Sequence, residues 1–183
     1  MLFLSESSVI KYIDWCITVI LSLEAQYMHW PNELEKAKTK CDFKDNSGFK
    51  DCIGIINGSL FPFAAAPAAS TQSNSFFSYK KKYGISGLLA CNSKRQIIYT
   101  NIGWAGCTHD NRIFSNSKLV TQLNLFFSGD EYLLGDSGFG CTPHVIVPYR
   151  NPKNQILTER QETFNGILSE VIQIDIYTRT FYI

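Results

Sequence analysis

The sequence predicts an α/β fold in which helices cover a mixed β-sheet. After a helical N-terminal stretch, three strand-like runs come first, and the turn Ser93-Lys94-Arg95 joins two of them as a hairpin. Helical and strand-like stretches then alternate along the rest of the chain. The chain has 183 residues, of which 45% are hydrophobic and 18% are charged. It is therefore long and apolar enough to bury one sizeable core.

The N-terminal part of the chain has the pattern of helices. Residues 5–28 begin with serines that can cap a helix, and apolar residues then recur at helical spacing. Trp30-Pro31 interrupts this pattern. Residues 32–40 are polar and are expected to be helical, and a turn is expected at 45–48.

The remaining patterns give strands and two further helices. β-branched and aromatic residues mark the strands, and apolar residues at helical spacing mark the helices. Residues 64–78 are rich in Ala, Pro, Ser and Asn and are expected to be irregular. The expected strands are 53–61, 85–92, 96–104, 131–136 and 144–148, and the expected helices are 110–125 and 158–173.

No strong linker interrupts the chain. We expect residues 1–50 to form a short helical lead-in segment, and residues 51–183 to form the main domain.

Composition excludes several classes of protein. The formal net charge is +1, so no general positive field attracts DNA or a membrane surface. The six cysteines are scattered without the spacing of a zinc knuckle, and we expect them to be reduced. The N-terminus lacks a basic signal-peptide region, and the apolar run at 16–23 is too short to span a bilayer. We expect a soluble, intracellular protein without a membrane partner.

A carboxylate stands where one expected strand ends. The apolar run Tyr132–Leu134 leads into Gly135-Asp136-Ser137-Gly138, whose glycines permit a sharp turn. Asp136 is therefore expected at a strand mouth, where α/β folds place reactive side chains. An Asx turn that only closes the strand is the alternative.

Six short motifs follow one another along the chain. They are Ile53–Ser59, Tyr79–Ser86, Gly103–Phe114, Leu134–Phe139, Pro148-Tyr149 and Phe164–Ser169. In that order they resemble the motifs of the PIF/Harbinger transposase-derived nucleases, such as Gly-Trp-Pro-Gly-Ser-x-His-Asp-x-Arg-x-Phe and Leu-Gly-Asp-Ser-Gly-Tyr. The resemblance covers roughly residues 5–170.

The resemblance implies a ribonuclease-H-like fold and a DDE-type active site that cuts DNA with Mg²⁺ or Mn²⁺. It also implies a separate Myb-like partner for DNA recognition. The implied location is the nucleus, or the cytoplasm when no partner is present.

Such an active site needs several acids. Two divalent ions about 4 Å apart are held by converging carboxylates, because hard cations prefer oxygen ligands. By resemblance, Asp110 and Asp136 are the metal ligands and catalytic residues. For Asp110, a helix N-cap is the alternative role.

Two departures from the family pattern affect the expected acids. Asn57 stands where the family has its first-strand aspartate, and its neutral amide offers one acceptor oxygen instead of two. The family's last catalytic glutamate corresponds to a position near Ile176. Asp175, a further candidate metal ligand, is one residue away, which is a rotation of about 100° on a helix. We therefore expect a domain that is truncated at its C-terminal end.

Three interpretations follow. The first is a divalent-metal-dependent DNA endonuclease whose site is degenerate, with Asn57 as a weakened ligand. The second is a catalytically dead DNA- or protein-binding module. In it Lys80, Lys81, Lys82 and Arg112 would bind nucleic acid, with Lys94, Arg95, Tyr79 and Tyr83 as further contacts. The third is a product that does not fold stably.

Overall fold

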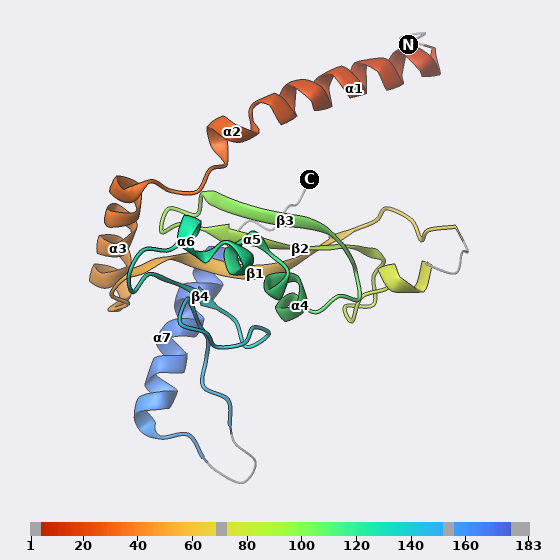
Figure 1. The fold of residues 1–183 in the computed structure, drawn as a ribbon. Coiled ribbons are helices and arrows are strands. Elements are labelled where there is room, and N and C mark those ends of the chain that lie inside the picture. Colours follow the sequence, from red (N-terminus) through yellow and green to blue (C-terminus); the bar gives the residue numbers. More distant parts are fainter. Residues whose placement is uncertain (1–4, 69–72, 152–155, 177–183) are drawn as a thin grey trace.

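A computed structural model describes residues 5–68, 73–151 and 156–176 (Figure 1). A five-stranded sheet forms the centre of the body, and helices pack against it. In chain order the elements are α1 (Glu6–Ser22), α2 (Glu24–Tyr27), α3 (Glu33–Ser47), β1 (Cys52–Pro62), η1 (Ser73–Phe76), β2 (Gly84–Cys91), β3 (Ile97–Ala105), α4 (Asp110–Ser115), α5 (Lys118–Thr121), α6 (Leu123–Phe126), β4 (Tyr132–Gly135), β5 (Val145–Ile146) and α7 (Glu159–Ile176).

The sheet is mixed, with the strand order β3-β2-β1-β4-β5. The β1–β2 and β2–β3 pairs are antiparallel, whereas the β1–β4 and β4–β5 pairs are parallel. β1 lies at the centre, and its first half is an apolar run that is buried on both faces of the sheet. This architecture confirms the predicted mixed α/β sheet with flanking helices and is consistent with a ribonuclease-H-like fold.

Two hydrophobic cores lie on opposite faces of the sheet. On one face, Ile56 of β1 belongs to a buried cluster with Ile113 of α4 and Leu119 of α5. On the other face, Ile55 belongs to a cluster with Leu168 of α7 and with side chains of α3. Successive side chains of a strand point to opposite faces of the sheet, so the neighbouring residues Ile55 and Ile56 of β1 belong to different cores. α4 and α7 are thereby fixed on the two sides of the same strand.

The predicted hairpin is confirmed as β2 and β3, but the helix predicted at 110–125 is wrong. That segment forms three short helices, α4, α5 and α6. Asn116 ends α4, and its side-chain Nδ2 donates to the carbonyl of Arg112 at 2.8 Å. Ser117 then takes an extended backbone conformation. Asn and Ser interrupt helices because their side chains compete for backbone hydrogen bonds.

Two other helices are longer than predicted. α3 begins with a capping box between Asn32 and Glu35 and continues through the turn expected at 45–48. It ends at Gly48, whose φ of +77° is the left-handed conformation that glycine tolerates. α7 extends to Ile176, three residues beyond the predicted end. The division of the chain at residue 50 stays a prediction.

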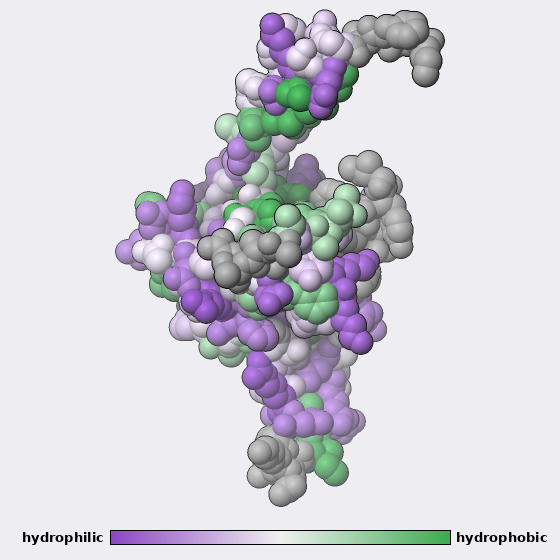
Figure 2. Space-filling view, turned by 90° about the vertical axis from the view of Figure 1, so that its right-hand side faces the viewer, coloured by the Kyte–Doolittle hydropathy of each residue, from purple (hydrophilic) through white to green (hydrophobic). Residues whose placement is uncertain are grey.

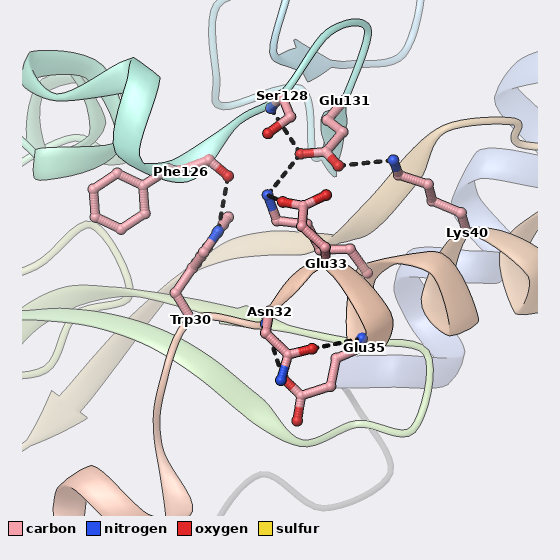
Figure 3. Close-up of polar contacts among 9 residues, drawn as sticks. Trp30, Asn32, Glu33, Glu35, Lys40, Phe126, Ser128 and Glu131 are labelled. Carbon is pink, nitrogen blue, oxygen red and sulfur yellow. Dashed lines mark hydrogen bonds and ion pairs between the residues drawn. The ribbon is translucent and has the colours of Figure 1, made fainter.

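α1 stands away from the body (Figures 1 and 2). No residue of α1 is buried, although most of its side chains are apolar. The chain rejoins the body at Trp30, whose indole Nε1 donates to the carbonyl of Phe126 at 2.8 Å (Figure 3). Among the described residues, no helix combines the length and the apolar character needed to cross a membrane.

A buried charge cluster joins α3 to the start of β4 (Figure 3). Glu131 is 1% exposed, and its carboxylate forms ion pairs with Lys36 Nζ at 2.9 Å and Lys40 Nζ at 2.7 Å. The same carboxylate accepts a hydrogen bond from the backbone N–H of Ser128 at 2.8 Å. Lys36 is 4% exposed, so this is a buried pair that fixes the helix to the sheet.

Candidate functional site

The register of two parallel strands brings Asn57 beside Asp136. Ile56 of β1 pairs with Gly135, the last residue of β4. The next residue along each strand is therefore Asn57 on β1 and Asp136 after β4. Both side chains are half-buried. β4 ends at Gly135, so the predicted position of Asp136 at the end of a strand is confirmed. This end of β4 lies next to the central strand β1.

α4 adds a second carboxylate directly over β1. A Cβ atom placed on Gly58 would lie 2.0 Å from Cγ of Asp110, so the carboxyl group occupies the space that a side chain would need. Any residue other than glycine at position 58 would displace Asp110. The predicted N-cap role of Asp110 is wrong, because His109 is the N-cap of α4 and Asp110 is its first helical residue.

The two carboxylates border one small region. Around Gly138, the position of an added Cβ lies 2.9 Å from Oδ1 of Asp136 and 3.6 Å from Oδ2 of Asp110. Asp136 Oδ1 accepts a hydrogen bond from the Gly138 N–H at 2.8 Å. The Asx turn that was the alternative for Asp136 is therefore present, and Asp136 borders the same region as Asp110 while it forms this turn.

Contacts from α4 and from Arg150 hold the loop that follows Asp136. Asn111 Oδ1 accepts a hydrogen bond from the backbone N–H of Gly140 at 3.0 Å. Phe139 is 1% exposed, and its ring packs edge-to-face on Phe114 with centroids 5.9 Å apart. Arg150 also donates from Nη2 to the carbonyl of Ser137. These contacts preorganise the carboxylate pair.

The electrostatic environment of Asp110 disfavours its charge. Burial raises the pKa of the Asp110 carboxyl group above its usual value, and the neighbouring charge of Asp136 raises it further. The positive charges of Lys80 and His109 oppose this increase only in part. Two like charges held close together in this way are characteristic of sites that bind a cation or transfer protons.

The cavity at these carboxylates has a volume of about 470 Å³. It is lined by Asn57, Gly58, Tyr79, Lys80, Asp110, Asp136, Ser137, Pro148, Ser169, Ile172 and Gln173. β1, α4, the loop after β4 and α7 thus all contribute. Asn57 lines this cavity, and within the described residues no hydrogen bond of its side-chain amide is seen.

The sequence predicted an acid of this helix, Asp175, at the site but missed two other residues of α7, Ser169 and Gln173, which line the cavity. Ser169 and Gln173 are polar and lie four residues apart, one helical turn, so both face the cavity. Leu168 and Ile172 beside them are buried in the core. This polar pair beside an apolar pair is the sequence signal that could have located the helix face.

The other predicted site residues have different places. Lys80 lines the cavity, whereas Lys81, Lys82 and Arg112 are exposed and do not line it. Asp175 lies within α7, but its side chain is outside the described part, so its role as a ligand stays a prediction.

The turn between β2 and β3 lies away from the carboxylates. There Lys94 and Arg95 line cavities next to α3 and α7, and neither lines the carboxylate cavity.

The donor set fits one hard cation better than two. Asp110 and Asp136 supply carboxylate oxygens, and Asn57 supplies an amide oxygen, which are the donors that Mg²⁺ and Mn²⁺ accept. In the part of the chain that the structure describes, no three His, Cys, Asp or Glu side chains cluster at one point. Among the described side chains, a second cation would therefore find no third carboxylate.

Comparisons with known proteins identify the family of this chain. The family model described as DDE superfamily endonuclease matches residues 56–175. The chain is 25% identical to "Protein ALP1-like" of Arabidopsis thaliana in an alignment 182 residues long, which covers 90% of this chain and 43% of that protein. It is 21% identical to "Putative nuclease HARBI1" of Mus musculus over 151 residues, which are 82% of this chain and 42% of that protein.

The chain spans about two-fifths of the length of these curated relatives. No solved structure matches it significantly. The matched residues 56–175 contain Asn57, Asp110 and Asp136 together with the cavity face of α7. The match covers most of the chain and confirms the resemblance drawn from the motifs: the chain belongs to the DDE superfamily endonuclease family.

Proposed function

We propose that this chain carries a divalent-metal-dependent DNA endonuclease site in a degenerate form. One observation carries the proposal: Asp110 and Asp136 converge with Asn57 on a single cavity at the ends of two parallel strands. The raised pKa of Asp110 supports it, since a bound cation would relieve the repulsion between the two carboxylates.

Each residue of the cavity has a distinct proposed role. Asp110, Asp136 and the Asn57 oxygen would hold Mg²⁺ or Mn²⁺. A cation held there would supply Lewis-acid stabilisation of the phosphate oxygens and lower the pKa of an attacking water. Lys80, which borders the same cavity, would attract the phosphate of the DNA strand.

The proposed degeneracy rests on two neutral residues. Asn57 replaces a carboxylate on β1, and Gln173 presents an uncharged amide from α7. With two carboxylates in place of four, the site retains shape but lacks the charge to hold two cations. We therefore propose weak or absent strand cleavage for this chain.

A nicking assay tests this proposal. Supercoiled plasmid DNA is incubated with the chain in Mn²⁺, in Mg²⁺ and in EDTA. We expect at most slow nicking that requires the cation and is abolished by Asp136→Ala. Robust Mg²⁺-dependent nicking that disappears in Asp136→Ala would contradict degeneracy, and nicking that persists in Asp136→Ala would contradict the site itself.

A second candidate function is a binding module without catalysis. The exposed Lys81 and Lys82 beside the cavity favour it, because they add positive charge where DNA would approach. DNA binding that depends on salt concentration but does not require divalent cations would support this alternative. We further propose action in the nucleus with a separate Myb-like partner, in keeping with a net charge of only +1.

A further inference from the structure

A small, well-fixed hairpin stands at one wall of the carboxylate cavity. Phe77 and Tyr83 form an antiparallel bridge, and their rings pack with centroids 5.0 Å apart. Between them, the backbone N–H of Ser78 donates to the carbonyl of Lys82 at 2.9 Å. Residues 77–83, which we call the tip hairpin, therefore hold a defined shape.

Ser78 fixes the turn of the tip hairpin. It is 3% exposed, and its Oγ accepts a hydrogen bond from the backbone N–H of Lys80 at 3.2 Å. The backbone N–H of Lys81 donates to the Ser78 carbonyl at 3.0 Å, and Lys81 has a φ of +58°. A non-glycine residue in this left-handed conformation marks a turn that its surroundings impose.

The fixed turn presents an aromatic ring to solvent at the cavity. Tyr79 is 78% exposed and yet lines the same cavity as Asp110 and Asp136. Lys80 Nζ lies 5.7 Å from the centroid of the Tyr79 ring. Tyr83, the other tyrosine of the tip hairpin, is half-buried against Phe77 and lacks this exposure.

The exposed aromatic ring of Tyr79 restricts which ligands can bind there. An aromatic ring stacks on a nucleic-acid base only when the face of that base is uncovered. Inside a paired duplex both faces of every base are covered by neighbours. An unpaired or terminal nucleotide is therefore the DNA feature that matches Tyr79, and the adjacent Lys80 matches its phosphate.

We propose that Tyr79 stacks on an unpaired or terminal base next to the phosphate held at the carboxylates, so that the site selects DNA that is not fully paired there. The inference rests on the proposed function for the nature of the ligand, and it adds which DNA substrates bind. Tyr79 and Lys80 then act as specificity-determining residues.

Binding to labelled oligonucleotides tests this inference without any cleavage. The base analogue 2-aminopurine is placed at an unpaired position of a DNA strand, and fluorescence is titrated with the full chain in Ca²⁺ and, separately, in EDTA. We expect quenching by stacking, with tighter binding to the unpaired strand than to a closed duplex without free ends. Tyr79→Ala is expected to weaken binding about 5- to 150-fold, whereas Tyr79→Phe retains it.

Matched variants separate the possible results. Tyr27→Ala is the control, because Tyr27 is 72% exposed on α2 and lies outside the cavity. Equal affinity of Tyr79→Ala and the unchanged chain, or equal affinity for paired and unpaired DNA, would overturn the inference. Stacking that is retained in a chain that binds no Mn²⁺ in a calorimetric titration would reject the proposed metal-dependent site and leave this inference intact.

Discussion

The double variant Asn57→Asp/Gln173→Glu is expected to nick supercoiled DNA in Mn²⁺ roughly 100-fold faster or more than the unchanged chain. Each added negative charge stabilises a divalent cation, and a cation stabilises transition-state charge by several kcal/mol, which corresponds to this range of rates. The measurement is the initial rate of plasmid nicking at saturating Mn²⁺.

The geometry explains the choice of these two positions. Asn57 lies beside Asp136 in the parallel register of β1 and β4, and an Asn→Asp change preserves the shape of the side chain. Gln173 lines the same cavity from α7. The two changes therefore add two carboxylates to the cavity that Asp110 and Asp136 line, and neither replaces a residue of the hydrophobic cores.

The control for this variant adds equal charge elsewhere. Asn124→Asp/Gln26→Glu changes two exposed amides on α6 and α2. It is expected to leave the nicking rate unchanged. A folded repaired variant that nicks no faster than this control would show that the cavity is not a nuclease site, and Asp136→Ala in the repaired chain should abolish any gain.

Removing Glu131 is expected to cost about 3–5 kcal/mol of the free energy of unfolding at pH 7. The substitution Glu131→Ala leaves Lys36 buried, at 4% exposure, without its main counter-charge. Lys40 and the Ser128 N–H lose the same partner. A domain of this size is stable by only about 5–15 kcal/mol, so the loss is a large fraction of the total.

Urea denaturation measures the effect, and two variants bracket it. Glu33 also pairs with Lys36, at 3.2 Å, but its side chain is 75% exposed. Glu33→Ala is therefore expected to cost less than about 1 kcal/mol. Replacing both buried partners, Lys36→Met with Glu131→Leu, should recover much of the loss. A cost below about 1 kcal/mol for Glu131→Ala would contradict this role.

The contribution of Glu131 is also expected to depend on pH. Burial alone would raise the pKa of the Glu131 carboxyl group, but hydrogen bonds from Lys40, Lys36 and the Ser128 N–H outweigh burial and lower it. Stability from such a group is fully present above the ordinary glutamate pKa of about 4.3 and is lost as pH falls through the lower, folded-state value. The gap between the unchanged chain and Glu131→Gln should thus shrink below about pH 4.

Sequence patterns within short segments correctly predicted features that depend on residues close together in the chain. The β2–β3 hairpin and the position of Asp136 at a strand end both follow from strand-like apolar runs and the turn residues next to them in the chain. The break of the segment 110–125 at Asn116 was not predicted, because apolar spacing alone continues across it. There the polar competition of Asn and Ser for the backbone outweighs the periodicity.

The assembled site depended on contacts between distant parts of the chain. Resemblance to a family, and not spacing, suggested that Asn57 and Asp136 belong together, while their actual proximity is set by the register of two parallel strands. Gln173 was missed because packing of Leu168 and Ile172 in the core sets the rotation of α7 about its axis. That rotation is a tertiary property that the helix sequence alone does not reveal.

A calorimetric titration with Mn²⁺ tests the central claim most directly. The account predicts that the unchanged chain binds the cation weakly, that Asn57→Asp binds it more tightly, and that Asp136→Ala in either chain abolishes binding. Binding that survives Asp136→Ala, or no binding by either the unchanged chain or Asn57→Asp, would contradict a metal site at these carboxylates.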